Sequence, residues 1–453
     1  MPENSPSQKP KLPPSIPYIV GNEAAERFSF YGMKAILMTY MTGTLLISKE
    51  MASVYGHLFN VGVYLLPILG AVLADCFWGK YKTVIRLSVV YCFGHLVLAL
   101  PAELWGGKLH IPLFLGMALI ALGSGGIKSC ISAIVGDQFT AENQSLMEKV
   151  YGWFYLSINI GAAVSMTLTP WLLKKYGPEV AFGVPGIFML LATIIFYCGR
   201  KKYILVPPSG KNMFRDLTSR AGLTAVLKVS LVFVFLIVGW AIYEQNGYRW
   251  VAQAENMNPM IFAGISGLPE WTRNIHISAA QMQAVNPVLI LILVPLFSRV
   301  VYPFINRFYR LTLIRKIACG LWLMALSALL PLWFERNILS GVELNIAWQM
   351  PAYVILTTAE IMVYVTSLEL AYTQAPPSMK SLIMGMFLMT FALGNLLTAV
   401  INGLCEKHPE FLAGEAYYRF FFILGIVNAA IFLIVAAFYR EKTYLQEEGE
   451  TFS

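Results

Sequence analysis

The sequence predicts an all-α membrane protein with twelve transmembrane helices in two six-helix bundles around a central cavity. Apolar residues fill 57% of its 453 positions and charged residues only 13%, about half the charged share of a soluble domain. Twelve apolar runs recur along the chain, each near the roughly 20 residues that a helix needs to cross the bilayer core. The runs are too long and too uniformly apolar for barrel strands, and only helices or closed barrels satisfy the backbone in lipid.

A polar segment divides the runs into two sets of six, and this division defines the expected domains. We expect an N-terminal tail over 1–19, a first bundle over 20–198, a linker over 199–222, a second bundle over 223–438 and a C-terminal tail over 439–453. Two sets of six helices are typical of transporters built from two related halves. The runs lie near 20–46, 53–74, 82–101, 111–135, 150–172, 181–198, 223–243, 283–303, 312–334, 348–373, 381–403 and 418–438.

The distribution of basic residues predicts the orientation of the helices. Most of the 33 Lys and Arg residues fall in segments that share one side of the membrane with the N-terminus. Basic residues concentrate on the cytoplasmic side, so we expect both termini in the cytoplasm and the chain in the cell membrane. This topology accounts for the net charge of +8, and we expect no nucleic-acid partner. The longest outer segment is expected near 244–282.

Several other classes of site are not supported by the sequence. The six cysteines form no CxxC pair and no regular framework, which argues against a zinc site or a disulfide scaffold. Gly123 to Ser129 resembles a phosphate-binding loop only superficially, because Ile127 precedes Lys128 and no strand leads into it. No HExxH or GxSxG motif occurs, so we expect a chain that is not an enzyme and uses no cofactor.

The first apolar run carries an unusual cluster of charges: Glu23, Glu26, Arg27 and Lys34. An ionisable residue inside a spanning helix costs at least ~2.5 kcal/mol on insertion scales, so such residues are usually functional. At 100° per residue, Glu23, Arg27 and Lys34 lie within about 40° of each other, and Glu26 lies about 60° to one side. The cluster therefore forms one face that can point into a polar cavity. The alternative is a helix end at headgroup depth.

The cluster and five later motifs resemble the proton-dependent oligopeptide transporter family, a branch of the major facilitator superfamily. The run Glu23-Ala-Ala-Glu26-Arg27-Phe28, followed by Tyr31-Gly32, resembles the family's first-helix motif. The later matches are Gly70–Asp75 with Gly79–Lys82, Gly123–Lys128 with Gly136–Phe139, Phe154–Gly161, Trp240–Gln245, and Asn286–Pro287. The resemblance implies the major facilitator fold and proton-coupled symport of di- and tripeptides. The short loops favour a prokaryotic member. We expect the protein to work as a monomer.

The resemblance also implies roles for residues that could hold a peptide zwitterion. Arg27, Lys34 and Lys128 would supply positive charge for the carboxylate, and Glu360 negative charge for the amine. Asparagines could equally serve interhelical hydrogen bonding, and tyrosines plain packing. The remaining expected binding residues are Asn159, Asn286, Tyr31, Tyr64 and Tyr155.

Proton coupling and gating are expected to share residues with this site. We expect Glu23, Glu26, Arg27, His57, Lys128 and Glu244 to respond to protonation. The resemblance implies an outer gate between Lys34 and Glu244 and an inner gate between Lys128 and Glu360. A lone histidine in an apolar helix is usually structural, but His57 stands where animal peptide transporters carry a proton-sensing histidine. The other function considered is a related proton-coupled symporter for nitrate or another small metabolite, because membership of a fold alone does not decide the substrate.

Overall fold

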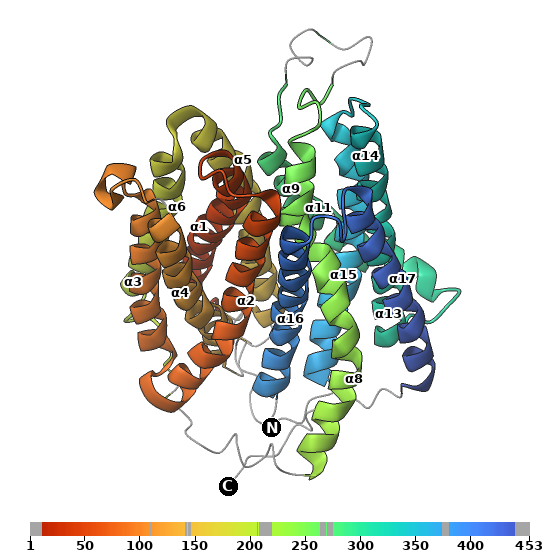
Figure 1. The fold of residues 1–453 in the computed structure, drawn as a ribbon. Coiled ribbons are helices and arrows are strands. Elements are labelled where there is room, and N and C mark those ends of the chain that lie inside the picture. Colours follow the sequence, from red (N-terminus) through yellow and green to blue (C-terminus); the bar gives the residue numbers. More distant parts are fainter. Residues whose placement is uncertain are drawn as a thin grey trace, which may run out of the picture.

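In the part of the chain that the computed structural model describes, all regular structure is helical apart from isolated bridges, and the two halves form two bundles (Figure 1). The residues that the structure describes are 11–108, 110–140, 143, 146–205, 207, 220–262, 269, 275–373 and 380–439. The helices of the first half are α1 (Ile16–Gly43), α2 (Lys49–Leu73), α3 (Lys80–Ala99), α4 (His110–Asp137), α5 (Met147–Tyr176) and α6 (Pro178–Cys198).

The second half contains six spans, several of them built from more than one helical segment. The seventh joins α8 (Arg220–Tyr243), η4 (Glu244–Gly247) and α9 (Arg249–Ala254). The eighth joins η5 (Ala279–Ala284), α11 (Val285–Leu296), η6 (Phe297–Val301) and α12 (Tyr302–Asn306), and the ninth joins α13 (Leu313–Ser327) and α14 (Leu329–Leu339). The last three are α15 (Gln349–Thr373), α16 (Lys380–Lys407) and α17 (Glu415–Phe438).

The prediction of twelve spans is confirmed within the described residues. Eleven of them are long enough and apolar enough to cross a membrane. The twelfth is α1, which is 28 residues long, or about 42 Å at 1.5 Å per residue. It differs from the others because its charged cluster lowers its hydropathy.

Most expected segment boundaries differ from the structure by up to four residues, and the seventh span differs by more. Helix α1 begins at Ile16, a few residues before position 20, with a proline in its first turn, a position where the missing N–H costs nothing. The seventh span does not end at Tyr243 but continues to Ala254. The outer segment expected over 244–282 was therefore wrong at its start. Polar residues such as Gln245 end the apolar run in the sequence, although their side chains are buried in the structure.

Each bundle has a hydrophobic core of its own. One core is built mainly from residues of α1–α6, and two further clusters are built from α8–α17. The bundles meet where α2 packs along α16 and α5 packs against α11, and Figure 1 shows α2 beside α16. The first core also includes Tyr248, Val251 and Ala252, so the second half packs on the first at the end of the molecule that carries α9.

Candidate functional site

The charged cluster of α1 is buried inside the first bundle. Glu23 is 2% exposed, Glu26 0% and Arg27 7%. The Arg27 side chain bridges the two carboxylates: its Nε lies 2.6 Å from Glu23 Oε1 and 2.9 Å from Glu26 Oε2. The contact with Glu23 is a well-aligned hydrogen bond. Neither Glu26 oxygen has an aligned hydrogen bond among the described residues, so one cation holds two carboxylates with unequal geometry.

Burial of the whole cluster contradicts the alternative of a helix end at headgroup depth. Lys34, two turns further along α1, is also buried at 8% exposure. Side chains at headgroup depth would reach water by snorkelling. The side chains of this cluster instead lie inside the protein, where the carboxylates and the cations neutralise each other.

Glycines let α1 lie unusually close to α5 beside the cluster. A Cβ added at Gly161 would lie 2.7 Å from the carbonyl oxygen of Ala24. A Cβ at Gly32 would lie 2.9 Å from Thr169 Oγ1. The small residues in the Tyr31-Gly32 and Asn159-Ile160-Gly161 segments therefore permit backbone contact between the helices.

Lys128 of α4 faces aromatic rings and makes no ion pair with a described residue. Its Nζ lies 4.2 Å from the Phe30 ring centroid and 5.1 Å from that of Tyr64. The expected inner-gate contact between Lys128 and Glu360 is not formed in this structure. Lys128 is left half-buried and available to another anion, and its gating role stays a prediction.

Glu360 of α15 receives a hydrogen bond from the second bundle's own asparagine. Asn286 Nδ2 donates to Glu360 Oε2 at 2.7 Å and to Thr357 Oγ1 at 3.0 Å. The bond joins α11 to α15, as the interhelical alternative for Asn286 anticipated. Tyr31 and Tyr155 of the first bundle lie within electrostatic range of Glu360. Expected binding residues from both bundles therefore lie around the same site.

The tyrosines expected to line the site keep partial access to solvent. Tyr31, Tyr64 and Tyr155 are all half-buried. The Tyr64 ring stacks on Phe391 of the second bundle with centroids 5.0 Å apart. Asn159 donates from Nδ2 to the Tyr155 carbonyl at 2.9 Å, so this bond lies within α5 and not between helices.

A layer of buried polar side chains joins the bundles above the charged cluster. Lys34 Nζ donates to Glu244 Oε2 at 3.0 Å, which brings together the two residues expected to form the outer gate. Asn60 Nδ2 donates to the same Glu244 oxygen at 2.9 Å and to Asn395 Oδ1 at 3.0 Å. His57 Nδ1 lies 2.8 Å from Asn395 Oδ1.

Sequence reasoning missed Asn60 and Asn395, although both side chains are fully buried. Asn60 follows His57 by three residues, and that spacing on one helix face was an available signal. The sequence gave a weaker indication that Asn395 belongs to the site, because an asparagine in an apolar run often serves only helix packing.

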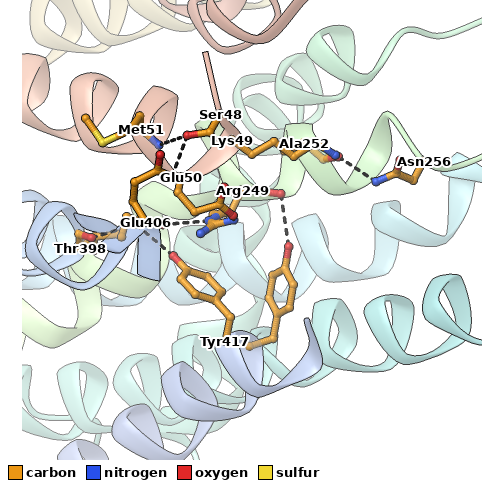
Figure 2. Close-up of polar contacts among 12 residues, drawn as sticks. Ser48, Lys49, Glu50, Met51, Arg249, Ala252, Asn256, Thr398, Glu406 and Tyr417 are labelled. Atoms are coloured by element: carbon orange, nitrogen blue, oxygen red, sulfur yellow. Dashed lines mark hydrogen bonds and ion pairs between the residues drawn. The ribbon is translucent and has the colours of Figure 1, made fainter. Parts of the chain in front are cut away.

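A second polar network lies at the end of the molecule that carries α9, and Figure 2 shows Arg249 between Glu50 and Tyr417. Arg249 Nη1 lies 2.9 Å from Glu50 Oε1, and its Nε donates to Asn402 Oδ1 at 2.8 Å. The guanidinium also lies over the Tyr417 ring, 4.3 Å from the centroid. One side chain thereby contacts α2, α16 and α17.

The positions of the matched motifs agree with a comparison against protein families. The family model described as "PTR2: POT family" matches residues 81–223 and 217–420. The chain belongs to the POT family. It is 38% identical over 359 residues to rat solute carrier family 15 member 2, covering 70% of this chain and 48% of the relative. It is 35% identical over 369 residues to Drosophila peptide transporter family 1, covering 72% and 48%. The chain thus spans about half the length of these relatives.

Solved structures of POT family members share the fold over nearly the whole chain. An auto-inhibited POT family peptide transporter superposes with a TM-score of 0.85 at 30% identity, covering 96% of this chain and 99% of that one. The POT family transporter PepTSo superposes with a TM-score of 0.84 at 32% identity, covering 95% and 99%. The expectation of the major facilitator fold is confirmed, and this chain is a multi-pass membrane protein of a transporter family.

Proposed function

We propose that this chain is a proton-coupled symporter that carries di- and tripeptides into the cell by alternating access. It works in the cell membrane with both termini in the cytoplasm, as a monomer and without a cofactor. The Drosophila relative at 35% identity is named as a peptide transporter, and the interior charges fit that substrate. The observation that carries the proposal is the separation of cation-rich and anion-rich sides across the bundle interface.

The two sides match the two ends of a peptide zwitterion. On the first bundle, Arg27 and Lys128 can receive the peptide carboxylate. On the second, Glu360 has no cationic partner within the described chain and is held by Asn286, so it can receive the amine. Charge pairs are strong in a partly buried site where water is scarce, and polar groups placed at both ends fix the ligand's direction.

Proton coupling follows from the shared cation. Arg27 is occupied by Glu23 and Glu26 together. A proton on either carboxylate removes one negative charge, so the positive charge of Arg27 is less fully neutralised and can attract another anion. The peptide carboxylate then replaces the lost charge, so proton and peptide bind with positive coupling.

Alternating access follows from gates on opposite sides of this site. The Lys34–Glu244 pair joins the bundles at one end, while Lys128 and Glu360 stand apart. Closing the second pair and opening the first would expose the site to the other side. Ligand and proton shift this equilibrium only by binding one arrangement more tightly than the other.

Reconstitution into liposomes tests the proposal directly. Uptake of labelled dialanine is measured under an imposed inward proton gradient, with competing di-, tri- and tetrapeptides and nitrate. We expect gradient-driven uptake that di- and tripeptides inhibit and tetrapeptides and nitrate do not. The Arg27→Gln variant should lose gradient-driven uptake. Inhibition by nitrate without any peptide competition would overturn the proposal and favour the symporter for a non-peptide solute.

A further inference from the structure

Asn395 crosses the bundle interface to contact His57. His57 and Asn60 lie on α2 of the first bundle, whereas Asn395 lies on α16 of the second. All three side chains are fully buried, with 0% exposure. The contacts among them therefore form without competition from bulk water, and each hydrogen bond restricts what its neighbours can do.

The Asn395 amide can have only one orientation. Its Nδ2 donates to the Phe391 carbonyl at 2.9 Å, and its Oδ1 faces His57 and Asn60. The flipped amide would set Oδ1 against the Phe391 oxygen and Nδ2 against the Asn60 Nδ2 donor, both unfavourable. Hydrogen-bond partners on both sides thus assign the amide.

This orientation fixes the tautomer of neutral His57. Because Asn395 Oδ1 can only accept, His57 Nδ1 must carry the hydrogen. The lone pair is then on Nε2, which is buried and has no hydrogen-bond partner among the described residues. An added proton must go to Nε2, while the Nδ1–H bond to Asn395 remains and becomes charge-assisted.

Asn60 connects this pair to the outer-gate carboxylate. Its Nδ2 divides its donation between Asn395 Oδ1 and Glu244 Oε2, and Glu244 Oε2 also accepts from Lys34. A stronger His57–Asn395 bond weakens the hydrogen bond that Asn60 donates to Asn395 Oδ1. The Asn60 amide can then shift, and its contact with Glu244 changes.

The charges around His57 favour such an effect. Glu244, Lys34 and Arg249 lie within electrostatic range of the ring, and the Tyr248 ring lies 4.7 Å away between centroids. A positive His57 adds a second cation near Glu244, which already pairs with Lys34. The new cation therefore competes for the carboxylate that joins the bundles.

We propose that Asn395 is a positioning residue for proton coupling: it sets the His57 tautomer and transmits the protonation of His57, through Asn60, to the Lys34–Glu244 gate. The proposal rests on the proposed proton-coupled symport. It extends the coupling apparatus to α16, so that side chains from both bundles position the proton-sensing histidine.

The tautomer can be measured without any transport assay. The chain has 5 histidines, so ¹⁵N-histidine labelling gives a tractable NMR spectrum, with His57 assigned from its loss in His57→Gln. We expect neutral His57 to carry hydrogen on Nδ1 in the unmodified protein and to shift toward the Nε2–H form in Asn395→Leu. Asn402→Leu is the matched control, because Asn402 is an equally buried amide on α16 that bonds Arg249 instead. It should leave the His57 tautomer unchanged.

Transport separates positioning from mere structural support. In liposomes, Asn395→Leu should lower gradient-driven dialanine uptake about tenfold while peptide exchange without a gradient changes less than twofold. Asn395→Asp keeps the acceptor and adds a negative charge that favours the imidazolium, so the pH midpoint of uptake should rise by about one unit. It also tests the proposal if the leucine variant fails to fold.

Two results would overturn the inference. One is an unchanged His57 tautomer in Asn395→Leu, and the other is an unchanged pH dependence of dialanine uptake in Asn395→Asp. Absence of peptide uptake by the unmodified protein would instead count against the proposed function, and the NMR result would still stand by itself.

Discussion

At the residue scale, the candidate site shows which roles can be predicted from a sequence and which cannot. The Glu23, Glu26 and Arg27 cluster was predictable because charges in an apolar run are costly. The Lys34–Glu244 contact was predictable only through the family resemblance, since its members lie 210 positions apart. Asn395 contacts His57 across 338 positions, and nothing local in either segment marks that pairing.

A prediction at this scale concerns the close contact between α1 and α5. Gly161→Ala places a methyl group 2.7 Å from the Ala24 carbonyl oxygen and 3.2 Å from the Phe28 nitrogen. Backbone atoms cannot move aside as a flexible side chain does, so we expect a loss of about 1–3 kcal/mol in stability. Thermal unfolding in detergent measures it as a lower melting temperature.

Gly152→Ala supplies the control on the same helix. A Cβ at Gly152 meets nothing within 4 Å, and alanine is the better helix former. We expect an unchanged or slightly higher melting temperature. Equal destabilisation by both substitutions would mean that helix contact is not what Gly161 provides.

At the element scale, hydropathy located the twelve spans but not the polar joints within them. The runs end within a few residues of the helices they predicted, because lipid requires each span to be continuous and apolar. The seventh run was ended too early, at Tyr243, the residue before η4 begins. The short helix α9 beyond it buries Trp250 and Val251 against the rest of the protein. Tertiary packing, which hydropathy does not sense, keeps this segment helical.

Arg249 on α9 gives the second prediction. It pairs with Glu50 of α2 and with Asn402 of α16, so Arg249→Met should loosen the end of the molecule where these helices meet. Arg249→Met removes the contacts to both helices at once, whereas the Glu50 side chain, 32% exposed, can be hydrated after its partner is lost. Cys405 of α16 lies near this pair and is 5% exposed, and we expect a membrane-impermeant maleimide to label it at least severalfold faster in the variant.

Two comparisons give that measurement its meaning. Cys405→Ala should remove the additional labelling in the Arg249→Met background, since free cysteines elsewhere, such as Cys198, are exposed from the start. Glu50→Gln keeps a hydrogen-bonding partner for Arg249 and should raise the labelling rate less. An unchanged rate in Arg249→Met would show that α9 is held by its apolar contacts alone.

At the scale of the whole molecule, the bundles are joined at the α9 end while the second expected gate pair is apart. The Lys34–Glu244 pair, the amide layer and the Arg249 network all lie between the two halves. We expect the Lys34→Ala and Glu244→Ala substitutions to be strongly non-additive in transport rate, because either one removes the same contact. A double variant whose loss equals the sum of the two single losses would argue against a shared gate.

The balance of interior charges sets a limit on what one transport cycle can carry. Among the described residues around the candidate site, the carboxylates are those of Glu23, Glu26, Glu244 and Glu360, and the cations are Arg27, Lys34 and Lys128. The Arg249–Glu50 pair adds one charge of each sign. With His57 neutral, the carboxylates exceed the cations by one. A neutral zwitterionic peptide does not change that sum, whereas one proton makes it zero. Because unbalanced charge in a low-dielectric interior is costly, we expect about one proton to move with each neutral dipeptide.

The reversal potential of uptake measures this ratio. Liposomes are clamped with potassium and valinomycin at several voltages under known pH and peptide gradients, and the voltage of zero net dialanine flux gives the proton number. We expect about one proton per peptide, from the neutrality argument, and the same value in Asn395→Asp, because that variant changes when His57 takes a proton and not how many cross. A ratio of two in the unmodified protein would mean that His57 itself delivers a proton across the membrane. The excess carboxylate would then not define the stoichiometry.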